Sequence, residues 1–373
     1  MLRLLQSLLR QAYILMGKSL LCKPLVERFF IHGLIVLPIC LLSANAHAID
    51  FLHPSQPSIG PVDVAVVVNK QDANSLLMGD YYLKARSIPL KNLIVVDIPK
   101  TPSLDLTYFE PLRKLIDAQL SPNIQVIVLM WTTPYAVNCN SITSAISLGF
   151  NAKQCEDGCA VGIKNPYFNS SSKNPAHDFN MRLSILLPTD DIDLAKAIID
   201  RGVLSAFNHN ESTGYFLKTS DDARSKPRAQ FFPRDLTKIE SKKIVLRTIH
   251  ADSIKDKKDI MFYFTGLAFV ANLKTLNFMP GAIADHLTST AGVLYNNWQM
   301  SSLKWLEAGA TGSYGSVSEP CNYWQKFPNP KVLVQHYLAG ETLVEAYWKS
   351  VYWPTQGLIM GEPLAAPFTN NQQ

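Results

Sequence analysis

The 373-residue chain has few charged residues, and their small positive excess stands at its beginning. Only 17% of the residues are charged, and their formal sum is +5. Five basic residues and one acidic residue in positions 1–48 account for +4 of this sum, which leaves +1 for the rest. The body of the chain therefore lacks the positive excess that neutralises phosphates, which argues against nucleic acid as a partner.

The chain also lacks the short motifs of common nucleotide-binding and catalytic sites. It has no phosphate-binding GxxxxGKS/T loop, no GxGxxG loop between a strand and a helix, no HExxH zinc motif and no GxSxG nucleophile elbow. It shows no internal repeat and no low-complexity tract. We therefore expect no cofactor and no metal. With 47% hydrophobic residues, the chain can nevertheless bury a large core.

Residues 1–48 have the pattern of a secretory signal peptide. Basic residues precede an apolar run over 33–42 that is short for a bilayer span, and Ala46 and Ala48 match the A-x-A pattern of a signal peptidase site. We predict cleavage after Ala48 and export to the periplasm or the extracellular space. Two alternatives stay open: a true start at Met16, and a retained segment that would be the only membrane contact.

Four cysteines remain once Cys22 and Cys40 leave with the signal peptide. They are Cys139, Cys155, Cys159 and Cys321. An even number in an exported chain predicts disulfides, and four cysteines allow three pairings. Cys155 and Cys159 could instead hold a metal, but no second close pair stands nearby, so zinc is the weaker interpretation.

Apolar runs alternate with amphipathic segments after a linker over 49–61. The first strands are predicted at 62–68, 92–97 and 124–131, with helices at 75–86 and 106–120. This order implies parallel strands joined by right-handed crossovers. We predict a single α/β domain over 62–368, in which helices flank a mainly parallel sheet as a flavodoxin-like three-layer sandwich, and a tail over 369–373.

Residues 133–185 interrupt the alternation. They hold three cysteines and little periodicity, so we predict a disulfide-stapled insertion. Residues 207–240 are polar and mixed. The later predicted elements are helices at 191–206, 300–308 and 332–347 and strands at 260–264, 280–284 and 310–317.

Chemically interesting side chains follow two of the later strands, where open parallel sheets bind their ligands. Asp285 and His286 end one strand, and a His can act as a general base that a carboxylate orients. Adjacent side chains on a strand point to opposite faces, so Glu319 could supply the carboxylate instead. The structural alternative is that Asp285 caps a turn and that backbone groups satisfy His286.

Cys321 is a candidate thiol nucleophile if His286 lowers its pKa. The alternative is a disulfide to one of the three upstream cysteines, and an oxidising compartment favours it. The candidate catalytic residues are thus Asp285, His286, Glu319 and Cys321. Two non-catalytic hypotheses compete with them: a binding or assembly factor, and a metal- or glycan-binding module over 138–160. An aromatic band is expected in the core or in a surface groove; it comprises Tyr337, Tyr347, Trp348, Tyr352 and Trp353.

A set of short segments is recognisable along the chain. They are 66–69, 79–82, 85–89, 280–289, 306–315, 319–322, 326–328, 340–343, 345–350 and 361–364. Together they resemble an uncharacterised bacterial family found with exosortase, the membrane enzyme of a protein-sorting and exopolysaccharide-linked system. The resemblance covers nearly all of 62–368. It implies an accessory or binding factor whose partners are components of a protein-sorting or polysaccharide-export system.

The strand and helix order and the closing Gly361-Glu362-Pro363 are similar to gingipain-type cysteine peptidases of the caspase-like class. In those enzymes one strand ends in a catalytic His followed by Gly, and the next strand ends in the catalytic Cys. Thr265-Gly266 and Asp285-His286 stand at these places here, so the resemblance implies the fold without the dyad. A hydrolase refitted with the candidate residues is the alternative to the binding factor.

Overall fold

A computed structural model describes residues 59–207 and 210–369 of the chain. The predicted signal peptide, most of the linker over 49–61 and the last residues of the tail lie outside these ranges. Within them, no helix is both long enough and apolar enough to cross a membrane.

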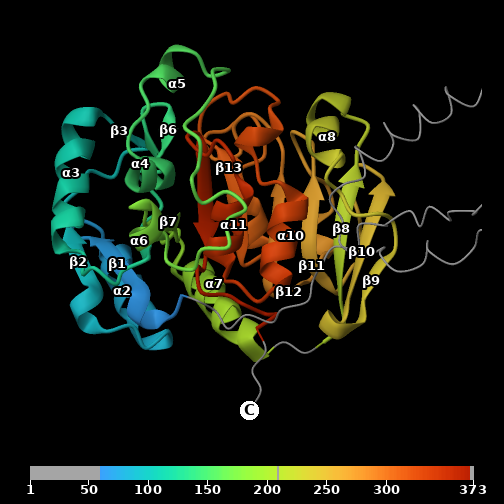
Figure 1. The fold of residues 1–373 in the computed structure, drawn as a ribbon, viewed down its shortest axis with the longest axis horizontal. Helices are drawn as coiled ribbons and strands as arrows, with labels where there is room; N and C mark the ends of the chain where they lie inside the picture. Colours follow the sequence, from blue (N-terminus) through green and yellow to red (C-terminus); the bar gives the residue numbers. More distant parts are fainter. Residues whose placement is uncertain (1–58, 208–209, 370–373) are drawn as a thin grey trace, which may run out of the picture. The chain divides into compact units, whose positions relative to one another are not determined.

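An eleven-stranded sheet runs through the described chain (Figure 1). Its strands, in spatial order, are β2 (Leu93–Val96), β1 (Val64–Asn69), β4 (Val126–Met130), β7 (Leu183–Leu186), β14 (Gly357–Gly361), β13 (Gly312–Ser316), β12 (Phe278–His286), β11 (Ile260–Thr265), β8 (Ser212–Lys218), β10 (Ile244–His250) and β9 (Thr237–Ile239). The pairs from β2 to β7 and from β13 to β10 are parallel, whereas β14 runs antiparallel to β13 and β9 antiparallel to β10. The predicted α/β class with a mainly parallel sheet is confirmed.

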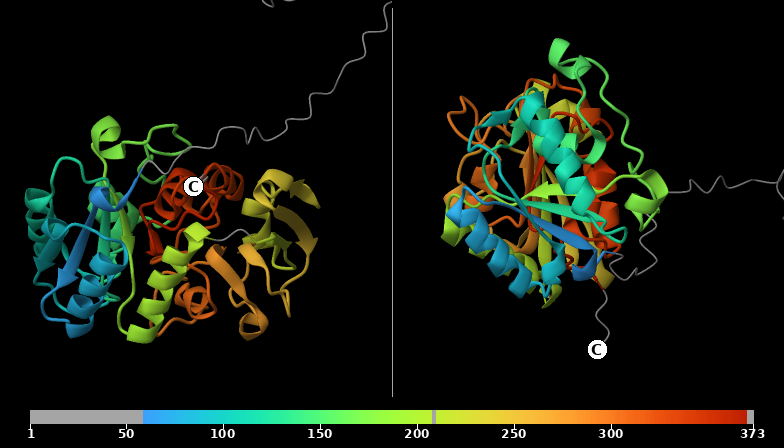
Figure 2. Two further views of the ribbon diagram at one scale, coloured as in Figure 1. Left: turned by 90° about the horizontal axis from the view of Figure 1, so that it is seen from below. Right: turned by 90° about the vertical axis from the view of Figure 1, so that its left-hand side faces the viewer.

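Helices cover both faces of the sheet (Figure 2). On one face, α7 (Ile192–Leu204) contacts both α2 (Ala73–Ala85) and α9 (Leu303–Glu307). On the other face lie α10 (Pro330–Leu338) and α11 (Leu343–Ser350), which pack against each other. The remaining long helices are α3 (Leu106–Gln119) and α8 (Asp222–Ala229). This is the three-layer arrangement that alternating strands and helices predict.

Short polar side chains begin these helices by accepting a hydrogen bond from a backbone N–H of the first turn. The capping residues are Asp72, Asp105, Asp191, Asp221 and Asn329. Such caps satisfy donors that have no partner within the helix. The carboxylates among them also favour the positive end of the helix dipole.

The continuous apolar runs form the core. Every residue of β1, β4 and β11 is buried, as expected for strands covered on both faces. The largest hydrophobic cluster extends from β1 to β14, and a second one gathers around Trp305 beside β11 and β12. Strands with such a continuous pattern were the ones that the sequence predicted best.

Five strands of the main sheet were not predicted as such: β7, β8, β9, β10 and β14. β8 and β9 lie in the polar and mixed stretch over 207–240, and β7 lies in the range predicted as an insertion. β10 and β14 are short apolar runs that were not assigned as strands. Pairing with neighbouring strands holds the glycine-containing β8 and the polar β9 extended.

The helix predicted over 332–347 is wrong as a single helix. It is two helices, α10 and α11, separated at Gly340, whose φ of +94° is costly for any other residue. Thr342 and Glu345 then start α11 with a reciprocal capping box. The break lets α10 and α11 pack against each other on the same face of the sheet.

The segment over 133–185 carries more structure than predicted. A small sheet joins β3 (Ser103–Leu104), β5 (Ala136–Val137) and β6 (Asn140–Ser141), and α4 (Ile142–Leu148) packs on β7 and β14. Short helices follow at α5 (Lys153–Glu156) and α6 (Pro175–Phe179). The disulfide-stapled part therefore lies before β7.

The two halves of the sheet repeat one strand order that the sequence does not reveal. In each half the first strand (β1 or β8) has the second (β2 or β10) on one side and the third and fourth (β4 and β7, or β11 and β12) on the other. The local contacts repeat as well: Asn69 N donates to Ser75 Oγ, and Thr219 N donates to Ser225 Oγ. Each half therefore has its own topological switch point, which is where ligands of such sheets bind.

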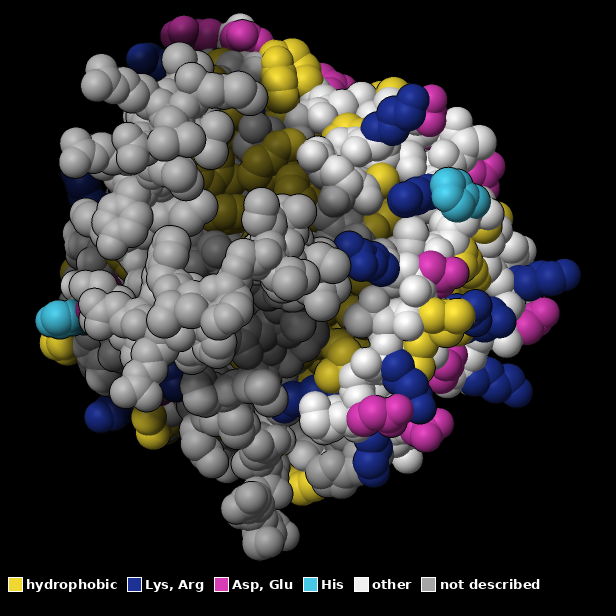
Figure 3. Space-filling model, turned by 45° about the vertical axis from the view of Figure 1, so that its right-hand side comes forward, with side chains coloured by type: hydrophobic (Ala, Val, Ile, Leu, Met, Phe, Trp, Pro, Cys, Tyr) yellow, Lys and Arg dark blue, Asp and Glu magenta, His cyan; other side chains and the backbone are white. Residues whose placement is uncertain are grey.

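Basic and acidic side chains are interspersed on the face shown in Figure 3. Exposed ion pairs of the described chain include Lys226 with Asp222 and Lys238 with Glu240. Exposed pairs of this kind contribute little to stability.

Candidate functional site

The strand ends that the sequence singled out lie side by side. β11 and β12 pair in parallel, with Thr265 opposite His286 and Phe264 opposite Asp285. Thr265-Gly266 and Asp285-His286 therefore meet at one edge of the sheet. This edge lies next to the switch point between β8 and β11.

The carboxylate of Asp285 forms an ion pair with a buried arginine. Arg228, on α8, donates from one guanidinium nitrogen to Asp285 Oδ1 and from another to the carbonyl of Thr265 at 2.7 Å. Both side chains of the ion pair are 1% exposed. Burial raises the pKa of Asp285, and the positive charge of Arg228 opposes that rise. Such a pair ties α8 to the ends of two strands.

His286 is equally enclosed. Trp305 Nε1 donates to its Nδ1 at 2.9 Å, so the proton lies on Nε2, which donates to the carbonyl of Met300 at 3.0 Å. Burial lowers the pKa of His286 to about 3, and the ring is neutral near pH 7. Asp285 and His286 point to different partners, as alternation along a strand predicts.

Cys321 and Glu319 form a separate group. The sulfur of Cys321 is bonded to Cys159, and Glu319 Oε1 accepts a hydrogen bond from Cys321 N at 2.8 Å. Neither residue bonds to His286, because partners occupy both of its ring nitrogens. The four candidate catalytic residues thus fall into two sets.

Two disulfides staple the loops after β4 and β13, as predicted from the even number of cysteines. Cys139 is bonded to Cys155 and Cys159 to Cys321, which selects one of the three possible pairings. Among the described residues, no group of three or more side chains is placed to hold a metal ion.

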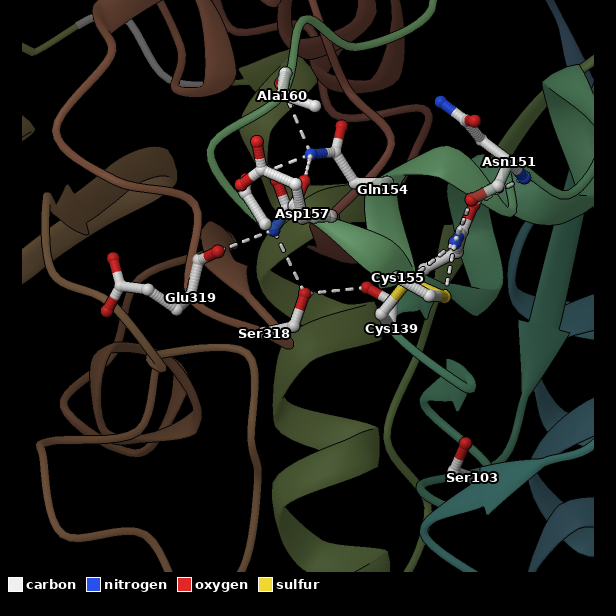
Figure 4. Close-up of a disulfide and its surroundings, with 12 residues drawn as sticks. Ser103, Cys139, Asn151, Gln154, Cys155, Asp157, Ala160, Ser318 and Glu319 are labelled. Carbon is white, nitrogen blue, oxygen red and sulfur yellow. Dashed lines mark hydrogen bonds between the residues drawn. A yellow bond between two sulfur atoms is a disulfide. The ribbon is translucent and has the colours of Figure 1, made fainter.

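Two glutamine side chains organise the backbone near the disulfides, and Figure 4 shows one of them, Gln154, beside the Cys139–Cys155 disulfide. Gln154 Nε2 donates to the carbonyls of Asp157, Gly158 and Ala160 at 3.2, 2.9 and 3.2 Å. Gln356 Nε2 donates to the carbonyl of Glu319 at 2.7 Å. In Figure 4 the Glu319 carboxylate points away from the Cys139–Cys155 disulfide. Both glutamines keep a side-chain oxygen that receives no hydrogen bond.

Aromatic side chains from separate segments meet near these loops. Of the predicted aromatic band, Tyr337, Tyr347 and Trp348 are buried in the core, whereas Tyr352 and Trp353 are half-buried. Phe168 and Trp324 approach Tyr352, with ring centroids 5.1 and 6.4 Å away. The aromatic band was predicted to lie in the core or in a surface groove. In the structure, three of its members lie in the core and two lie at the surface.

Several residues that matter at these sites had no signal in the sequence. Arg228 lies in a short polar helix, and Trp305 lies nineteen positions from its partner His286. Only the tertiary structure brings them to the strand ends. Chemically, the described strand ends offer buried, paired groups, and the nearby loops offer aromatic rings and amides.

No protein-family model matches the chain, and no curated protein matches it. One solved structure, described only as a protease, is similar with a TM-score of 0.41 and 12% sequence identity. The match covers 83% of this chain and 79% of that one. At this TM-score, the likeness carries no argument about activity.

Proposed function

We propose that the protein is an exported, non-catalytic binding factor that serves a protein-sorting or polysaccharide-export system. The proposal that the protein is not a catalyst rests on the burial of His286. Its side chain is 1% exposed, and both ring nitrogens form hydrogen bonds within the protein. A general base must reach the proton that it removes, and a buried, doubly bonded imidazole cannot.

The other candidate groups support the same proposal. The thiol of Cys321 is in a disulfide, and the carboxylate of Asp285 is paired with Arg228. The disulfides fit a protein that folds in an oxidising compartment. The link to an exosortase-type system rests on the sequence resemblance alone.

Capture of partners from cells tests the binding role. The mature protein, tagged and crosslinked in the periplasm, should recover the same components from wild-type cells and from cells carrying Glu319→Gln. Glu319 is exposed, so this variant should fold like the wild type. A cell-surface phenotype of the deletion strain should be restored equally by both forms.

The refitted hydrolase predicts the opposite result. If the protein turns over a peptide or ester library and Glu319→Gln abolishes turnover without changing the melting temperature, the non-catalytic proposal is wrong. If the capture recovers no component of a sorting or export system, the proposed partners are wrong.

A further inference from the structure

Six aromatic side chains form a cluster at the surface, which we call the aromatic platform. Its members are Phe168, Phe231, Tyr323, Trp324, Tyr352 and Trp353. They come from four separate segments: the stapled segment before β7, the residues after α8, the loop after β13, and the connection from α11 to β14. Tyr323 is 46% exposed, and the others are half-buried. Apolar surface gathered in this way is typical of a binding site.

The rings of the platform hold one another. Phe231 packs edge-on against Trp324 with centroids 4.9 Å apart, and Tyr352 lies 5.9 Å from Trp353. Trp353 in turn contacts Tyr323 at 6.4 Å. Rings fixed by such contacts present their faces and edges at little cost in side-chain entropy.

Two buried glutamines fix the backbone of the loops beside the platform. The side chains of Gln154 and Gln356 are 1% and 2% exposed, and the Oε1 atom of each receives no hydrogen bond. The bonds that their amide nitrogens donate to backbone carbonyls hold both amides in this orientation. A Cβ built on Gly162 would lie 2.7 Å from Trp353 Cβ and 3.4 Å from Gln154 Oε1, so the lack of a side chain at Gly162 lets the segments of Trp353 and Gln154 approach each other.

The platform also carries polar atoms, which are the hydroxyl groups of Tyr323 and Tyr352 and the indole N–H groups of Trp324 and Trp353. Groups of this kind need hydrogen-bond partners when a ligand covers them. A ligand with hydroxyl groups supplies such partners, whereas a hydrocarbon chain does not.

A positive charge stands at one end of the platform. Lys164 is exposed, and its Nζ lies 5.7 Å from the ring centroid of Tyr352. At the other end, Lys326 Nζ lies 5.8 Å from the ring of Tyr323, and burial lowers the pKa of this lysine to about 8. Lys164 therefore offers the accessible charge, and it complements a carboxylate.

We propose that the aromatic platform binds an oligosaccharide whose sugars carry carboxylate groups. The apolar faces of pyranose rings would lie on the aromatic rings, sugar hydroxyls would bond to the tyrosine hydroxyls and indole N–H groups of the platform, and Lys164 would pair with a carboxylate. This inference rests on the proposed function, to which it adds a ligand class.

Calorimetric titration of the mature, disulfide-bonded protein tests the proposal. The probes are oligogalacturonate and a neutral gluco-oligosaccharide of the same length. We expect the acidic probe to bind more tightly. Tyr323→Ala should weaken its binding about tenfold, as expected for the loss of one stacking face. Lys164→Gln should remove the preference for the acidic probe and leave binding of the neutral probe unchanged.

Trp298→Ala is the matched control, because Trp298 is 67% exposed and makes none of the platform's ring contacts. Equal binding of the two probes would overturn the assignment of Lys164. Binding of neither probe, or an equal loss in Trp298→Ala and Tyr323→Ala, would overturn the platform as a glycan site. In that case, capture of an export component would still support the binding factor, so the two failures are distinguishable.

Discussion

His286 illustrates how one residue can look catalytic in a sequence and be structural in the fold. Its position at a strand end, next to an acid, matches the expected place of a base. In the structure it joins the strand to Trp305 on α9 and to the backbone at Met300. The imidazole thus links two segments by hydrogen bonds at both of its ring nitrogens, next to the second hydrophobic cluster.

Replacing His286 by Ala should lower the free energy of unfolding by about 2–4 kcal/mol, because it leaves a cavity and two unpaired groups. Urea denaturation followed by circular dichroism measures the change. His250→Ala, at an exposed position, is the control and should stay within about 0.5 kcal/mol. Unchanged stability together with a lost activity would instead make His286 a catalytic residue.

The same histidine should make stability depend on pH. Its pKa is lowered to about 3 in the folded chain and is about 6.5 when unfolded, so below pH 6.5 the unfolded state binds the extra proton. Stability should therefore fall as the pH falls, by up to about 1.4 kcal/mol per pH unit. Urea denaturation between pH 7.5 and 5 checks this.

His286→Gln provides the comparison, since its curve should be shallower over this range. The raised pKa of Asp285 acts in the opposite sense, because the folded state then holds the proton. Asp285 is present in both proteins, so the difference between the two curves isolates the histidine. Parallel curves would show that His286 is not the titrating group.

At the scale of elements, the connection between α10 and α11 shows how one glycine changes a helix prediction. The apolar pattern continues across the break, which is why one helix was expected over 332–347. Gly340 has a φ of +94°, and the chain turns there so that both helices cover the sheet.

Gly340→Ala should cost about 1–2 kcal/mol of stability, because an L residue is strained at this φ. Thermal and urea unfolding measure the loss. Gly60→Ala is a suitable control: its added Cβ would meet only Asp63 Oδ2, at 3.9 Å, and we expect a change below about 0.5 kcal/mol. A continuous, stabilised helix in Gly340→Ala would contradict the break.

At the scale of the whole molecule, the disulfides join segments that are far apart in sequence. Cys159 and Cys321 are 162 positions apart, whereas Cys139 and Cys155 are 16 apart. The longer link ties the stapled segment before β7 to the loop after β13, next to the aromatic platform.

Replacing both Cys159 and Cys321 by Ser should therefore destabilise the protein more than replacing Cys139 and Cys155. On chain entropy the losses are about 5 and about 3 kcal/mol. Denaturation of the two double variants ranks them, and thiol mapping of the mature protein should find all four cysteines bonded. Rapid alkylation of Cys321 near neutral pH would contradict the pairing and reopen cysteine catalysis.

Local patterns were sufficient for much of the fold. β1, β4 and β11 are continuous apolar runs, and α2, α3 and α7 have caps and periodicity, so their existence could be predicted within a few residues. β8 and β14 contain glycine and depend on their neighbours for pairing, which composition does not record.

The sequence by itself determined the α/β class, the mainly parallel sheet and the expectation of disulfides, because these follow from periodicity, composition and a count of cysteines. Only the tertiary structure decided the pairing of the cysteines, the commitment of Asp285 to Arg228 and the assembly of the aromatic platform. Each of these joins residues from separate segments. Which segments meet depends on the order of strands in the sheet, and no local pattern carries that order.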